Sequence, residues 1–93
     1  MTWLLLLEPA GRQDSWQPEY VRWFYKRTPL EEPWLNVTEY PAAAMGFLTE
    51  GEALAALAAW RRAAPRLGGL SRCVPIALAD AMLATEAWLS EVR

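Results

Sequence analysis

The stretch TEGEALAALAAWRRAA, residues 49–64, contains the clearest local structural signal in this chain. Thr49 and Glu52 have the spacing of a capping box, in which the threonine side chain accepts a backbone N–H and the glutamate reaches back. The alanines and leucines that follow are strong helix formers. The stretch therefore predicts a helix over residues 50–64, which Pro65 ends because proline cannot continue it.

Three strands are expected before this helix. Residues 3–8 form a short, continuous apolar run, which is typical of a strand buried on both faces and central in its sheet. Residues 20–27 and 34–40 alternate between two faces, as half-buried strands do. The prolines of residues 28–33 forbid regular structure there, so this segment connects the two strands, which we expect to be an antiparallel pair.

Residues 72–78 are compatible with two structures. Pro75 fits an edge strand, where no backbone N–H is needed, and it also fits the first position of a helix. Apolar residues recur at helical spacing from Leu78 onward, which favours a strand followed by a helix from about Asp80. The whole pattern predicts one compact α+β domain over residues 1–93, in which a mainly antiparallel sheet of three to four strands packs against two helices.

Six tryptophans and no histidine among 93 residues weigh against catalysis. Tryptophan concentrates in cores and interfaces, whereas histidine is the usual general base and the commonest metal ligand. The carboxylates and glycines do not have the spacing of a catalytic pair, a cation site or a phosphate loop. The lone Cys73 has apolar neighbours, which predicts a buried and unreactive thiol. We therefore expect a protein that is not an enzyme, without catalytic residues, cofactor or metal.

Charge and hydropathy predict a cytoplasmic protein without a membrane partner. The net charge is −2, so no global basic field draws the chain to nucleic acid. The apolar runs are much shorter than the roughly 18 residues of a membrane span. The first nine residues lack the positively charged region of a signal peptide, and a single cysteine fits a reducing compartment.

One face of the two middle strands is the strongest candidate for a binding surface. The chain is 54% hydrophobic and 12% aromatic, which is more apolar material than a small core hides. We expect the helices to cover the side that carries Val21, Trp23, Leu35 and Val37. Strict alternation then leaves aromatic and cationic residues on the opposite face: Tyr20, Arg22, Phe24, Lys26, Trp34 and Tyr40. This surface suits a protein partner or self-association as a homodimer, and the same residue types are also ordinary strand formers.

An arginine-rich segment offers nucleic-acid binding as the alternative. Arginines beside an aromatic ring bind phosphate and stack on bases, and they also complement the dipole at the end of a helix. The net acidity of the chain weighs against nucleic acid. The residues of this alternative are Trp60, Arg61, Arg62, Arg66 and Arg72.

Residues 44–53, Ala-Met-Gly-Phe-Leu-Thr-Glu-Gly-Glu-Ala, are similar to an Ala-x-x-Phe-x-Thr-x-x-Glu-Ala pattern found in small, mostly uncharacterised phage and mobile-element proteins. The resemblance covers about ten residues and the order of elements, since those proteins place strands before the pattern and a helix after it. It implies an intracellular protein, in the host cytoplasm, that binds a host or viral macromolecule as anti-CRISPR inhibitors do. It transfers no functional residues. A structural oligomer, such as a phage assembly component, is a further interpretation.

Overall fold

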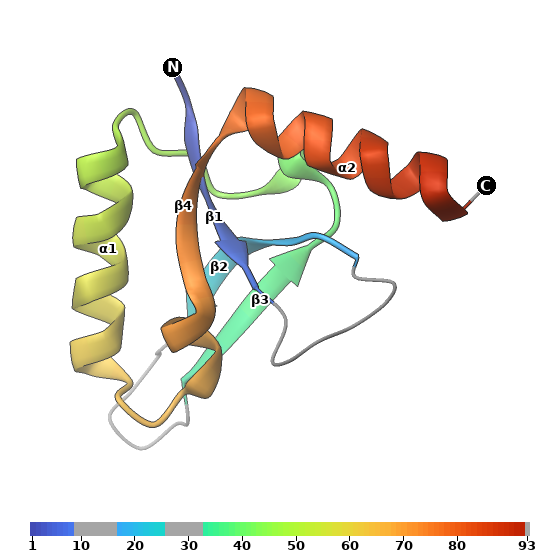
Figure 1. The fold of residues 1–93 in the computed structure, drawn as a ribbon. Coiled ribbons are helices and arrows are strands. Elements are labelled where there is room, and N and C mark those ends of the chain that lie inside the picture. The colour runs from blue at the N-terminus through green and yellow to red at the C-terminus, as the bar shows by residue number, and fades with distance from the viewer. Residues whose placement is uncertain (9–16, 26–32, 93) are drawn as a thin grey trace.

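A four-stranded antiparallel sheet in the order β3-β2-β1-β4 forms the centre of the protein. The computed structural model describes residues 1–8, 17–25 and 33–92. The strands are β1 (Trp3–Leu7), β2 (Glu19–Tyr25), β3 (Trp34–Thr38) and β4 (Cys73–Ala77). Within these residues, the sheet is accompanied by two long helices, α1 (Glu50–Ala63) and α2 (Leu78–Val92), and by two short ones, η1 (Pro41–Ala43) and η2 (Gly68–Arg72). The predicted α+β class is confirmed (Figure 1).

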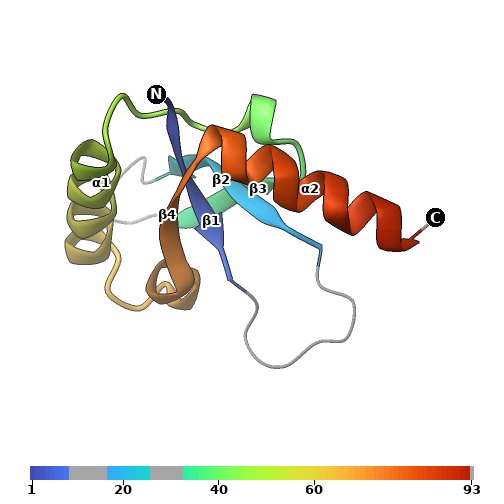
Figure 2. The same ribbon diagram turned by 45° about the horizontal axis from the view of Figure 1, so that its top comes forward.

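The central strand β1 separates two layers of core. Leu5 packs with Ala53 and Leu57 of α1 on one face of the sheet. Its neighbour Leu4 packs with Ala81 of α2 on the other face. The two helices accordingly lie on opposite sides of β1 and β4 (Figure 1, Figure 2). The prediction that this strand is central and buried on both faces is confirmed. Successive side chains of a strand point to opposite faces, so a continuous apolar run supplies both cores.

The loop before α1 forms backbone hydrogen bonds to both β1 and β2 where these two strands are no longer paired with each other. Pairing between β1 and β2 covers only the end of β1, where Leu6 lies opposite Tyr20. Beyond that point the N–H of Met45 donates to the carbonyl of Val21 at 3.0 Å. Trp3 and Phe47 exchange two backbone hydrogen bonds of 2.8 Å each. Residues 45–47 therefore bridge β1 and β2 and fix the start of α1 against the sheet.

The predicted capping box is present at the start of α1. The N–H of Glu52 donates to Oγ1 of Thr49 at 3.0 Å. In return Oε2 of Glu52 accepts from the N–H of Leu48 at 3.2 Å, one residue before the position expected in the standard motif. The first bond satisfies a backbone donor that a helix leaves unpaired at its N-terminus, and the second ties the residue before the N-cap to the first turn.

The C-terminal third is a strand followed by a helix, as the sequence favours. Pro75 lies in β4, which is an edge strand, so the missing N–H removes no hydrogen bond from a second neighbour. Helix α2 begins at Leu78, two residues earlier than predicted, directly after the strand. Its C-terminal end projects away from the strands (Figure 2).

The middle strands follow the predicted antiparallel arrangement, with β2 between β1 and β3. Of the predicted connector over residues 28–33, only Pro33 belongs to the described residues.

Candidate functional site

A β-bulge in β2 changes the face on which the second half of the strand presents its side chains. Val21 lies opposite Val37, as regular pairing requires, but the next residue of β3, Asn36, lies opposite Trp23. Arg22 is the extra residue that the bulge accommodates. A bulge of this kind re-aims the side chains that follow it, because one added residue shifts a pattern of period two.

The bulge places Phe24 in the core and Trp23 outside it. The Phe24 ring packs against the core beneath α1 and stacks on Trp60, with ring centroids 5.3 Å apart and an interplanar angle of 18°. Trp23 lies on the opposite face and is 51% exposed. Strict alternation predicts the reverse for both residues, so the expected position of Phe24 on the open face is wrong.

Tyr20 is a second correction to the predicted surface. Its side chain is 0% exposed and packs in the core with Leu4 and Ala81. The hydroxyl of Tyr20 donates to the carbonyl of Ala81 at 2.9 Å and lies 2.9 Å from Oγ1 of Thr85. Since the hydroxyl has only one proton, the Thr85 hydroxyl is the donor in the second bond. Tyr20 thus anchors α2 to the sheet, which a polar tip on an apolar ring allows.

The other four residues of the predicted surface are Arg22, Lys26, Trp34 and Tyr40. Arg22, Trp34 and Tyr40 are exposed, as expected. Lys26 lies outside the described residues.

Three aromatic rings of β2 and β3 form a cluster in which Tyr25 neighbours both tryptophans. Tyr25 stacks on Trp34 across the strand pair, with centroids 4.3 Å apart and an interplanar angle of 11°. Trp23 lies 6.1 Å from Tyr25 and is tilted by 56° to it. Such cross-strand stacking restrains the rings, and Trp34 nevertheless remains 50% exposed. We define the aromatic surface as the three rings and the polar and apolar residues beside them: Arg22, Trp23, Tyr25, Trp34, Asn36 and Met45.

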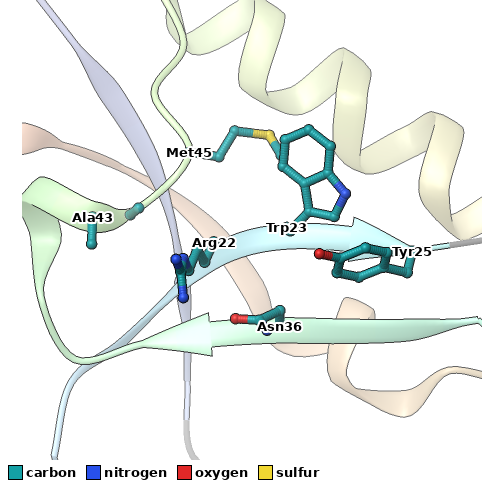
Figure 3. A pocket seen from close by; sticks show the side chains of 7 residues that line it. Arg22, Trp23, Tyr25, Asn36, Ala43 and Met45 are labelled. Carbon is teal, nitrogen blue, oxygen red and sulfur yellow. The ribbon is translucent and has the colours of Figure 1, made fainter.

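A pocket of about 540 Å³ opens on the aromatic surface. Arg22, Trp23, Tyr25 and Asn36 reach it from the sheet, and residues 43–45 close one side (Figure 3). The side chain of Met45 extends toward the indole of Trp23. The pocket therefore combines an aromatic wall, a thioether, an amide and a guanidinium.

The aromatic surface contains four residues that the sequence did not indicate: Trp23, Tyr25, Asn36 and Met45. Trp23 and Tyr25 were hidden because residues 20–25, YVRWFY, are apolar in both alternating sets except at Arg22. Only the cross-strand register decides which set is exposed.

The arginine-rich segment is largely used within the fold. The guanidinium of Arg61 donates two hydrogen bonds to the carbonyl of Leu70, from Nε at 3.1 Å and from a terminal nitrogen at 2.9 Å. The guanidinium of Arg72 donates a hydrogen bond of 3.3 Å to the backbone carbonyl of Glu8, the residue after β1. The indole of Trp60 stacks on Phe24 and packs against the core. Arg62 and Arg66 are exposed, so the structure does not bring the five residues together as one surface.

Cys73 is buried, as predicted. Burial raises the pKa of its thiol to about 11, although the nearby charges of Arg61 and Arg72 act in the opposite direction. The sulfur donates a weak hydrogen bond to the carbonyl of Gly69 at 3.4 Å. A thiol with this pKa stays protonated near neutral pH, and the thiolate is the nucleophilic form.

Within residues 1–8, 17–25 and 33–92, no helix has the length and hydropathy needed to span a membrane. Comparisons with protein-family models, with curated proteins and with solved structures give no match for this chain.

Proposed function

We propose that this chain is a non-enzymatic protein-binding domain and that the aromatic surface binds its partner. The observation that supports this most directly is the pair of half-exposed tryptophans, Trp23 and Trp34, each of which lies next to the ring of Tyr25. A tryptophan buries roughly 150–250 Å² when it is fully covered. Because both rings are already about half buried, roughly half of that area per ring still lies in water and forgoes the stabilisation of burial. A partner that covers both rings recovers it.

The composition of the aromatic surface supports a protein partner. Tryptophan, tyrosine and arginine are the residues enriched in the energetically dominant centres of protein interfaces, and this surface has all three around one pocket. The rings are borne by paired strands and neighbour one another, and Trp34 stacks on Tyr25, so little side-chain freedom remains to be lost on binding.

The resemblance of residues 44–53 to phage and mobile-element proteins extends this proposal to the kind of partner. On that basis the partner is a host macromolecule whose activity the domain modulates. Nucleic-acid binding is less well supported, because two of the four arginines in the alternative segment already bond to backbone carbonyls.

Self-association through α2 is a second candidate function. Met82 and Leu83 are 53% and 64% exposed on the side of this helix that points away from the buried Ala81. Leu89 is exposed further along the same helix. Light scattering after size exclusion, over a tenfold concentration range, tests this candidate. A mass that rises with concentration in the wild type and not in the M82S/L83S variant would support it.

A capture experiment tests the principal proposal. The tagged wild-type protein is expected to form a stoichiometric complex with one host protein, and the W23S/W34S variant is expected to bind it at least about 30-fold more weakly, as a hot-spot loss of about 2 kcal/mol implies. The M82S/L83S variant is the matched control, since it removes an equally exposed apolar pair from a different surface. Equal binding by W23S/W34S and wild type would show that the aromatic surface is not the binding site.

A further inference from the structure

The pocket beside Trp23 is rich in hydrogen-bond donors. Among the described residues that line it, Arg22 alone is charged, and it brings five N–H donors and no acceptor. Trp23 adds an indole N–H, while Tyr25 and Asn36 add a hydroxyl and an amide that can each donate. A ligand group that only accepts hydrogen bonds and carries negative charge complements this set.

The bulge gives the pocket a cation directly beside an apolar ring. In a regular strand, consecutive side chains point to opposite faces, so Arg22 and Trp23 could not share a site. The extra residue in β2 allows both to line the same pocket, with the Met45 side chain next to the indole (Figure 3). Bulges are over-represented where a binding site requires such a change of direction. The ligand that fits therefore has an anion next to an apolar side chain.

The charge of Arg22 also weighs against two other kinds of ligand, a cation and a nucleic-acid strand. Aromatic rings alone attract cations such as an ammonium group, but a guanidinium in the same pocket repels them. A nucleic-acid strand is held through several phosphates by several basic residues, whereas this pocket has one, in a chain of net charge −2. A single carboxylate, which a guanidinium binds in bidentate geometry, matches one arginine.

We propose that the pocket binds an acidic segment of the partner protein, with an Asp or Glu carboxylate on the guanidinium of Arg22 and a neighbouring apolar side chain against Trp23 and Met45. This inference rests on the proposed function and adds the chemical class of the segment that is recognised.

Two blocked peptides that differ by one group test the proposal. They are acetyl-Ser-Phe-Glu-Phe-Ser-amide and its counterpart with Gln in place of Glu. Each is titrated into ¹⁵N-labelled protein, and the indole N–H signal of Trp23 is followed after its assignment with the W23F variant. The Glu peptide is expected to shift this signal and to bind about two- to fivefold more tightly than the Gln peptide, the range expected for a partly exposed ion pair.

Two charge-matched variants locate the effect. R22Q is expected to abolish the preference for Glu while the affinity for the Gln peptide is retained. R62Q removes the same charge from the exposed end of α1 and is expected to keep the preference. The dispersed amide spectrum of each variant confirms that it is folded.

Several results would overturn the inference: equal binding of the two peptides, a preference that survives in R22Q, no shift of the Trp23 signal, or tighter binding of an oligothymidylate than of the Glu peptide at Trp23. The proposed function is judged separately by the capture experiment. A partner complex that is lost in W23S/W34S and unchanged in R22Q would leave that function standing and refute the role of Arg22.

Discussion

Replacing Tyr20 with phenylalanine removes one hydroxyl from the contact between the sheet and α2. In the folded protein this hydroxyl donates to the carbonyl of Ala81 and accepts from the hydroxyl of Thr85, both at 2.9 Å. The ring itself remains, so the apolar packing around Leu4 is retained. The Y20F variant therefore isolates the hydrogen bonds of a fully buried side chain.

The expected loss follows from those two bonds. A typical intramolecular hydrogen bond contributes about 1 kcal/mol net, and a buried group left without its partner costs about 1–3 kcal/mol. Thr85 is only partly buried, so its hydroxyl can turn to water and recover part of the loss. We expect Y20F to lower the free energy of unfolding by about 1–2 kcal/mol, which corresponds to a fall in Tm of roughly 5–15 °C for a domain of this size.

Urea unfolding followed by circular dichroism measures this change as a lower midpoint at an unchanged slope. The Y40F variant is the matched control, because Tyr40 is 64% exposed and substitutions at such positions usually change stability by less than about 0.5 kcal/mol. If Y20F and Y40F have the same midpoint, Tyr20 is not the buried anchor of α2 and the argument is refuted.

Three further predictions concern the bulge, the start of α1 and the buried thiol. F24A is expected to lower the free energy of unfolding by about 2–3 kcal/mol, because a ring that packs against the core is lost, whereas W23A lowers it by less than about 1 kcal/mol. A lower urea midpoint for W23A than for F24A would show that β2 has no bulge. T49A is expected to cost about 1 kcal/mol through loss of the cap, measured in the same way, and no change would contradict the bond to Glu52. The pKa of Cys73, raised from 9.0 to about 11, lowers the thiolate fraction at pH 8 about a hundredfold, so iodoacetamide should alkylate the folded protein at least that much more slowly than the urea-unfolded one. Because the pKa is raised on folding, the protonated thiol stabilises the fold below pH 9, and this contribution is lost as the pH rises toward 11. Equal alkylation rates for the folded and the urea-unfolded protein would show that the thiol is exposed.

Local signals predicted most of the secondary structure. The capping residues of α1 bond to backbone groups within the same turn, so their spacing in the sequence is sufficient to locate the helix start. The apolar run of β1 indicates burial on both faces without knowledge of its neighbours. Pro75 restricts β4 to an edge for the same local reason, since it lacks a donor.

The candidate site was predicted only in part. Arg22, Trp34 and Tyr40 are exposed as expected, while Tyr20 belongs to the core and Phe24 is partly buried against it. The error at Phe24 arises because the alternation assumed for β2 has no place for a bulge, whereas Tyr20, which precedes the bulge, is buried because α2 packs on the face that carries it. Tyr20 also needs a partner from α2 to satisfy its hydroxyl, and nothing near it in the sequence indicates that partner.

Short-range signals in the sequence establish which elements form, in what order, and where α1 begins, because those properties depend on hydrogen bonds and periodicities within a few residues. Which aromatic rings are buried and which line the pocket depends instead on contacts between distant segments. In residues 20–25 both faces of the strand carry aromatic side chains, so hydrophobicity favours neither. The choice is made by pairing with β3 and by the stacking of Phe24 on Trp60, two contacts between segments that lie apart in the chain.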